Sequence, residues 1–244
     1  MKIFITLLTA CFLSGSVHAA SLDDDVQRYA QVFADGKSVQ TELVESLAWM
    51  GISDPRLFDL IERRVRDEAE QSRYDRSKKN EIAYLIRALG FSGQTKYAPV
   101  LEQFLSAPVY ARYAKNALED MQNYRKWNPV ISNRASFNPK YSDDVNRILN
   151  MLRAEDFLLK RIGAKRVYFS NKDAVLLDTL ANEIRASYTR DDADSEVIDA
   201  IAWMVKALGA AKQAQYAPLL QEVVAQAKNR KIIKYAEQAL ERSR

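Results

Sequence analysis

Residues 82–101 read IAYLIRALGFSGQTKYAPVL, and residues 201–220 read IAWMVKALGAAKQAQYAPLL. Ten of the twenty aligned positions are identical, and others exchange like for like, as Tyr84 does with Trp203. Average residue usage would give about one identity by chance. A match of this strength indicates that one segment occurs twice within the chain.

The repeat extends well beyond these twenty residues. The same offset of 119 residues continues backward without a gap and pairs Asp59 with Asp178. It continues forward once three residues are inserted. The sequence therefore predicts a tandem duplication, with copies near residues 39–122 and 143–242.

The apolar pattern within each copy is helical. Apolar residues recur at spacings of three and four, as at Leu85, Ile86 and Leu89, and sustained alternation with period two is absent. This pattern predicts about eleven helices and no strands. The residue after a helix often needs a left-handed backbone, which favours glycine. We expect four glycines to end helices in this way: Gly51, Gly90, Gly163 and Gly209.

The spacing of these helical pairs is typical of one repeat class. Gly51 to Gly90 spans 39 residues and Gly163 to Gly209 spans 46, close to the period of about 40–47 residues of HEAT and armadillo repeats. Met50-Gly51 followed by Asp54-Pro55-Arg56 resembles the turn inside a HEAT hairpin. Ala-Leu-Gly followed by Tyr-Ala-Pro-x-Leu resembles the end of one HEAT helix and the start of the next.

The resemblance to the HEAT-repeat family, in an exported bacterial form, implies an all-α fold, an α-solenoid of stacked helical hairpins. It covers most of residues 39–122 and 157–242. The chain departs from the family at 163–176, where we expect a long turn that lacks Asp-Pro. Such solenoids expose extended surfaces that bind large partners.

The first residues have the order of a secretory signal. Met1-Lys2 precedes an apolar run from Ile3 to Leu13, and Val17-His18-Ala19 offers small residues for cleavage. The run is too short to span a bilayer. We expect residues 1–19 to be a signal peptide and the protein to be periplasmic. Alternatively, Leu8-Thr9-Ala10-Cys11 resembles a lipobox, which would anchor a lipoprotein through Cys11.

The expected mature chain lacks the residues of many catalytic sites. The signal peptide holds the only Cys and the only His, so no imidazole or thiolate remains for nucleophilic or zinc chemistry. We therefore expect no enzyme, no cofactor and no metal. The alternative is a carboxylate-dependent polysaccharide enzyme, since Glu45-Ser46 resembles the Glu-Ser pair of lytic transglycosylases.

Charge and hydropathy bear on the partner. Removal of the signal peptide removes one charged residue, Lys2, and leaves 35 basic and 32 acidic residues. This surplus of positive charge is too small for a dedicated nucleic-acid binder. We expect no transmembrane segment. The leading hypothesis is a scaffold or adaptor that binds another envelope protein. The alternative, a binder of an anionic envelope polymer, depends on three basic clusters: Arg63, Arg64 and Arg66; Lys160, Arg161, Lys165 and Arg166; and Lys228, Arg230, Lys231 and Lys234.

The predicted division of the mature chain is 20–122, a linker at 123–142, and 143–244. The stretch 121–142, MQNYRKWNPVISNRASFNPKYS, contains no acidic residue and interleaves cations with aromatics. Long irregular loops are often functional, and interfaces favour aromatics and Arg. The alternative is that Trp127 and Phe137 fill the junction between the two copies, while the cations keep the segment soluble. The candidate partner-binding residues are Tyr124, Arg125, Lys126, Trp127, Arg134, Phe137 and Lys140.

Two aromatic pairs are shared by the copies at the same helical phase. They are Tyr97 with Tyr216 and Tyr84 with Trp203. Because repeat cores are the positions that stacked units share, we expect both pairs to lie in the core.

Overall fold

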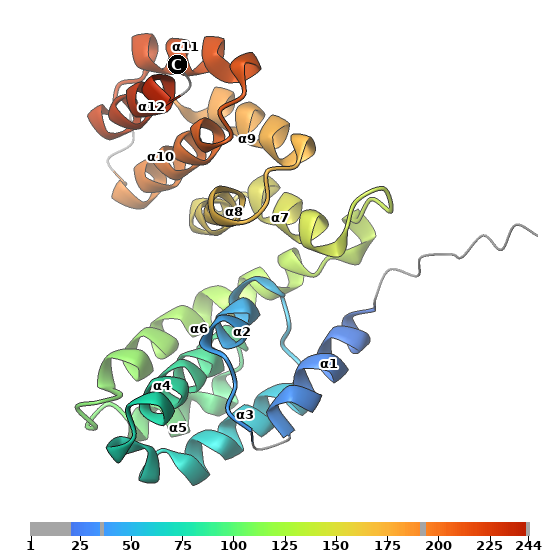
Figure 1. Ribbon diagram of the computed structural model, residues 1–244, viewed down its shortest axis with the longest axis vertical. Coiled ribbons are helices and arrows are strands. Elements are labelled where there is room, and N and C mark those ends of the chain that lie inside the picture. Colours follow the sequence, from blue (N-terminus) through green and yellow to red (C-terminus); the bar gives the residue numbers. More distant parts are fainter. Residues whose placement is uncertain (1–20, 35–36, 191–193, 243–244) are drawn as a thin grey trace, which may run out of the picture.

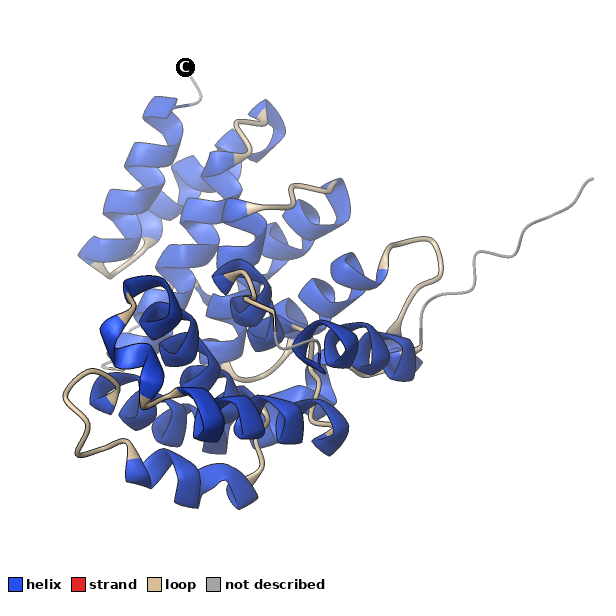
Figure 2. Ribbon diagram, turned by 60° about the horizontal axis from the view of Figure 1, so that its bottom comes forward, coloured by secondary structure: helices blue, strands red, loops and turns tan. Residues whose placement is uncertain are grey.

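The computed structural model describes residues 21–34, 37–190 and 194–242. Within these ranges every regular element is helical and none is a strand (Figure 2), which confirms the all-α class. Twelve α-helices are present in the described part of the chain. The expected signal peptide, its cleavage site and Cys11 lie outside the described residues.

The helices fall into two sets of six. The first set is α1 (Leu22–Ala34), α2 (Thr41–Ser46), α3 (Pro55–Glu68), α4 (Arg76–Phe91), α5 (Ala98–Gln103) and α6 (Ala111–Ile131). The second set is α7 (Asp143–Arg153), α8 (Phe157–Phe169), α9 (Ala174–Ser187), α10 (Ser195–Ala210), α11 (Ala217–Gln226) and α12 (Arg230–Arg242). The short 3₁₀ helices are η1 (Leu47–Trp49), η2 (Gln71–Tyr74), η3 (Thr95–Tyr97), η4 (Arg134–Ser136) and η5 (Ala214–Tyr216).

The structure confirms the tandem duplication. Helices α3 and α9 begin and end at positions that differ by 119, and the same is true of α4 with α10 and of η3 with η5. One tertiary contact is duplicated as well. The Tyr97 hydroxyl donates to Asp59 Oδ1 at 2.7 Å, and the Tyr216 hydroxyl donates to Asp178 Oδ1 at 2.7 Å. Tyr97 and Tyr216 are buried, as expected of core residues.

The helices form two layers, one of odd-numbered and one of even-numbered helices. In Figure 1, α8, α10 and α12 lie along the left flank of the second half, and α7 and α9 lie to their right. We call α2, α4, α6, α8, α10 and α12 the even-helix layer. Each half has its own apolar core, but Met151 and Leu159 of the second half belong to the core of the first. The two halves are thus packed against each other.

Local sequence explains where many helices begin. Asp54 precedes α3 and its carboxylate accepts a hydrogen bond from the Arg56 backbone N–H at 2.8 Å, while Pro55 occupies the first helical position. Gly51 has φ +68°, so a left-handed residue does stand at this turn. The segment Met50–Arg56 therefore forms a turn between η1 and α3, as its sequence predicted.

The other three glycines expected to end helices lie inside them. Gly90, Gly163 and Gly209 belong to α4, α8 and α10. A Cβ added at Gly90 would lie 2.5 Å from the carbonyl oxygen of Ala117, and one added at Gly209 would lie 2.2 Å from Cβ of Ala239. Gly90 and Gly209 therefore allow neighbouring helices of the even-helix layer to approach closely, whereas Gly163 faces Met151 and Leu152 of α7. Because α8 continues to Phe169, the turn expected at 163–176 is short.

The linker prediction also needs correction. Residues up to Ile131 belong to α6, which crosses the expected boundary at 122, and only the segment 132–142 is irregular apart from η4. Pro129 lies inside this helix. Met121, Tyr124, Trp127 and Ile131 are buried at helical spacing. Burial of this stripe outweighs the turn preference of Asn128-Pro129.

Candidate binding surfaces

Two aromatic residues of α6 that we expected to bind a partner are buried, and one of them, Trp127, lies at the junction of the halves. Tyr124 and Trp127 are 4% and 5% exposed, and their rings are in edge contact at 5.2 Å. The indole N–H of Trp127 donates to Asp156 Oδ2 at 2.8 Å, just before α8. A partner cannot contact these two side chains while the halves stay packed. Trp127 thus fills the junction, as the alternative interpretation of the linker expected, whereas Tyr124 packs against Phe91 in the core of the first half.

The predicted cations of the linker differ in their availability. Arg134 donates to Asp143 at 3.0 Å and lies 3.6 Å from Asp25, so it is not free for a ligand. The expectation of unpaired charge fails here because the fold brings α1 and α7 to the linker. Arg125, Lys126 and Lys140 are exposed, and their role in binding stays a prediction.

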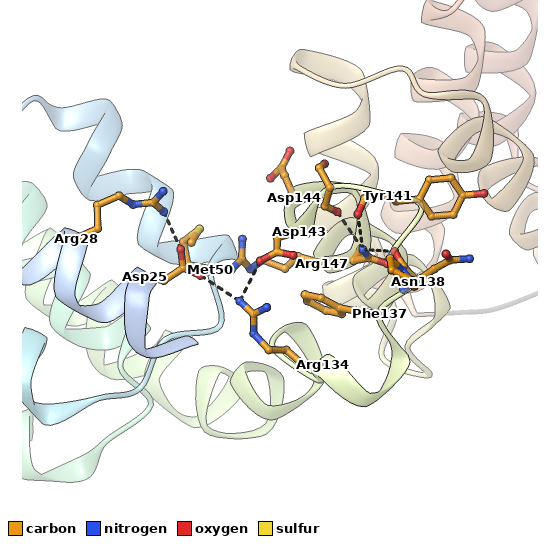
Figure 3. A pocket seen from close by; sticks show the side chains of 13 residues that line it. Asp25, Arg28, Met50, Arg134, Phe137, Asn138, Tyr141, Asp143, Asp144 and Arg147 are labelled. Atoms are coloured by element: carbon orange, nitrogen blue, oxygen red, sulfur yellow. Dashed lines mark hydrogen bonds and ion pairs between the residues drawn. The ribbon is translucent and has the colours of Figure 1, made fainter. Parts of the chain in front are cut away.

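A pocket of about 740 Å³ opens at this junction. Asp25 of α1 and Arg147 of α7 form an ion pair beside it, although they are 3% and 5% exposed, and Arg28 also pairs with Asp25 at 2.8 Å. Figure 3 shows Arg134 and Phe137 near this pair. Sequence reasoning missed Asp25 and Arg147, because 122 positions separate them and neither lies in a motif.

The charges around the junction pocket balance one another. Its lining holds three arginines and three aspartates. Asp144 is 3.5 Å from Arg166, so the acids also pair outward. The pocket therefore offers little net charge to a ligand, and its ion pairs connect the two halves. Phe137 is half-buried beside them.

A second candidate surface lies on the even-helix layer. Tyr84 and Trp203, which we expected in the core, are half-buried and form part of the solvent-facing stripe of α4 and α10. Arg87 and Lys206 follow one turn later on the same stripe. Equal helical phase in both copies identified a shared environment correctly: both rings pack against the core of their own half, but each keeps part of its surface in solvent.

Neighbouring helices add aromatic rings to this stripe at equivalent positions. Tyr84 packs against Tyr113 of α6 with ring centroids 6.2 Å apart. Trp203 packs against Tyr168 of α8 at 5.8 Å. The equivalent residues of the two halves are Trp49 and Tyr168, Tyr84 and Trp203, and Tyr113 and Tyr235. We call these six residues the aromatic face.

Two ammonium groups lie on the second half of the aromatic face. Lys206 Nζ is 4.1 Å from the ring centroid of Trp203, and Lys165 Nζ is 4.9 Å from it. In the described part of the chain no carboxylate lies within ion-pair distance of either. The pKa of Lys165 is lowered by burial and by the positive charges of Arg161, Lys206 and Arg87. The guanidinium of Arg166 on α8 lies 4.1 Å from the ring centroid of Trp49, so members of the two halves meet at the junction.

Most other members of the basic clusters are already paired. Arg64 is buried and pairs with Glu68 and Glu81, both at 2.8 Å. Asp199 accepts from Arg161 at 3.0 Å and from Lys231 at 2.6 Å. Their positive charge is therefore largely compensated, and the lysines of the aromatic face differ from them in this respect.

These features define a helical-repeat protein of the α-solenoid class with an aromatic surface in each half. No family model matches the chain, and no curated protein matches it. A search of solved structures finds human deoxyhypusine hydroxylase in complex with glycerol, with a TM-score of 0.37 and 17% identity over 90% of this chain and 84% of that one. Because this neighbour is an enzyme, we withdraw the expectation that the chain catalyses nothing. We transfer no reaction at this similarity.

The described helices were also compared with the length and hydropathy of membrane spans. None of the helices in residues 21–34, 37–190 and 194–242 is long and apolar enough to cross a bilayer.

Proposed function

We propose that this protein is an exported solenoid of the HEAT-repeat type that acts as a scaffold or adaptor and binds another envelope protein through its aromatic face. The observation that carries the proposal is the recurrence of three aromatic residues at equivalent, half-buried positions of both halves. Tyr and Trp are enriched at the centres of protein interfaces because they bury large areas with few rotatable bonds.

The arrangement of the face supports an extended partner. Both halves present an aromatic pair at the same place, with Arg87 or Lys206 one turn away. A partner that reaches both halves gains the effective concentration of a second, linked contact. Arg87 lies 4.0 Å from Asp120, so charge recognition next to apolar contact is supplied chiefly by Lys206 of the second half. Localisation in the periplasm depends on the N-terminal sequence alone.

Affinity purification of tagged variants from the native periplasm tests this proposal. The test variant is Tyr84→Ser with Trp203→Ser. The matched control is Tyr74→Ser, because Tyr74 is 92% exposed on η2, away from the aromatic face. We expect one stoichiometric partner with the wild type and the control, and its loss with the test variant. Equal recovery by all three, at equal thermal stability, would refute a binding role for this face.

A further inference from the structure

The second half of the aromatic face has the chemistry of a carboxylate site. We infer that Lys165 and Lys206 bind the side-chain carboxylates of an acidic, extended segment of the protein partner. This inference rests on the proposed function and names the partner's chemistry. The two ammonium groups lie over aromatic rings: Lys165 over Trp203, and Lys206 over Tyr168, Trp203 and Tyr235.

Unpaired lysines that are held over rings are prepared for an anion. A flexible surface lysine loses side-chain entropy when it forms an ion pair. Lys206 Nζ lies 4.1 Å, 4.7 Å and 5.9 Å from three ring centroids, so its position is already restricted. Its hydrogen-bond donors still lack a carboxylate in the described structure. A partner carboxylate would therefore gain two charge contacts with little further ordering.

Like charges converge at this place. The cations that lower the pKa of Lys165 are Arg161, Lys206 and Arg87, and only Asp199 raises it. Asp199 is itself shared between Arg161 and Lys231. An anion placed among these groups relieves their mutual repulsion, which is the electrostatic complementarity that selects a partner.

The first half shows that this positive charge is a property of one copy. Glu42 and Ser46 stand at the positions equivalent to Arg161 and Lys165. The charge of Glu45 is the main cause that raises the pKa of Tyr84, and Glu42 contributes to it. The aromatic face is thus acidic near Tyr84 and basic near Trp203. The basic half fits acidic side chains, and the acidic half does not.

The apolar neighbours of the two lysines favour a polypeptide over a polysaccharide. Phe169 is 71% exposed and contacts Tyr168 and Trp203 at 4.8 Å and 6.2 Å between ring centroids. An apolar peptide side chain covers this ring without leaving a polar group unpaired. A sugar can stack on this ring only through its C–H face, which buries less apolar area than an aromatic or branched aliphatic side chain does. The segment we infer therefore has acidic residues interspersed with apolar ones.

Binding of defined probes to the full mature chain tests the inference. The probes are a short peptide rich in Glu and Phe, the same peptide with Gln at every Glu, and polygalacturonate as an anionic polymer. The test variant is Lys165→Gln with Lys206→Gln. The matched control is Lys78→Gln with Lys115→Gln, which removes the same charge from two exposed lysines of α4 and α6 that belong to no candidate binding surface. Titration calorimetry gives affinities at low and at raised salt.

We expect the wild type and the control to bind the acidic peptide, and the test variant to bind about tenfold more weakly, the size expected for two part-exposed charge pairs. The Gln peptide should bind the wild type, the control and the test variant equally weakly. Raised salt should weaken the binding of the acidic peptide but not that of the Gln peptide. Equal affinity for both peptides, or equal loss in test and control variants, overturns the inference. Tighter binding of polygalacturonate than of the acidic peptide also overturns it. The proposed function stands and only the carboxylate site fails if any of these results is found while the variant Tyr84→Ser with Trp203→Ser still loses the native partner.

Discussion

Replacing Gly90 with alanine measures how closely α4 approaches α6. The added Cβ would lie 2.5 Å from the carbonyl oxygen of Ala117, 2.7 Å from its Cα and 2.9 Å from its carbonyl carbon. All three atoms are backbone, so no side chain can turn away and the helices must separate. Overpacking of this kind costs about 1–3 kcal/mol. Removing a glycine from a helix interior returns about 0.5–1 kcal/mol. We expect Gly90→Ala to destabilise by about 1–2 kcal/mol.

The duplicated position supplies a control of a different kind. At Gly209 the nearest atom is the side-chain Cβ of Ala239, at 2.2 Å, and the Ala239 Cα is 3.0 Å away. Gly209→Ala should therefore destabilise by a similar amount, whereas Gly209→Ala with Ala239→Gly should restore most of the loss. Ala117→Gly should not rescue Gly90→Ala, because the obstructing atoms at α6 belong to the backbone.

Urea and thermal unfolding, followed by circular dichroism and calorimetry, give the comparison. A change of 1 kcal/mol corresponds to about 2–4 °C in Tm for a chain of this size. The two cores can unfold in separate steps, so each variant is compared at the transition of its own half. Unchanged or raised stability of Gly90→Ala would refute the close approach. Rescue by Ala117→Gly as complete as rescue by Ala239→Gly would refute the distinction between backbone and side-chain obstruction.

Four further predictions concern the core, the junction, pH and processing. Leu89→Ala and Leu208→Ala should each lower the free energy of unfolding in urea by about 2–5 kcal/mol, because both leucines are buried. A loss as small as that of a surface substitution would contradict their burial. Asp25→Ala should destabilise by about 3–5 kcal/mol, because Arg147 would stay buried without its partner. The double variant Asp25→Leu with Arg147→Met should lose less stability, since it leaves no unpaired charge. No loss of stability in Asp25→Ala would contradict the buried pair. The pKa of Asp59 is lowered from 3.8, chiefly by the hydrogen bond from Lys96 and further by that from Tyr97, so its stabilisation is present above the ordinary pKa and lost as pH falls through the lowered one. In Asp59→Asn the free energy of unfolding should fall less steeply as the pH is lowered. A pH dependence equal to that of the wild type would contradict this prediction. N-terminal sequencing of the periplasmic form should begin at Ala20, whereas a lipidated Cys11 or an uncleaved chain would contradict the export prediction.

Sequence reasoning succeeded where the determinants are local or are copied. Asp54-Pro55 begins a helix because its cap and its fixed φ act within four residues. The offset of 119 gave the correspondence of α3 with α9 and of α4 with α10 because ungapped repetition needs no knowledge of packing. The fold class and the duplication could therefore be predicted.

Sequence reasoning failed where long-range contacts decide the outcome. Pro129 stands in a helix because Trp127 is held by Asp156, a residue from the other half. Arg134 has no acidic neighbour within the linker, yet the fold supplies Asp25 and Asp143. The phase of Tyr84 and Trp203 is equally compatible with core and surface until the neighbouring helices are placed. The aromatic face is visible in the sequence only as a repeated aromatic, one turn before a repeated cation.

The pair between Asp25 and Arg147 has a consequence for the order of events during synthesis. A ribosome adds about 5–20 residues per second, so about 6–24 s pass between the appearance of Asp25 and that of Arg147. Throughout this interval the first half can form its own core, but the carboxylate of α1 has no arginine from α7 to meet. Burying it alone would be costly. Arg28 of α1 pairs with this carboxylate in the meantime, so α1 can pack against the first core, and the buried pair with Arg147 is completed only when α7 arrives.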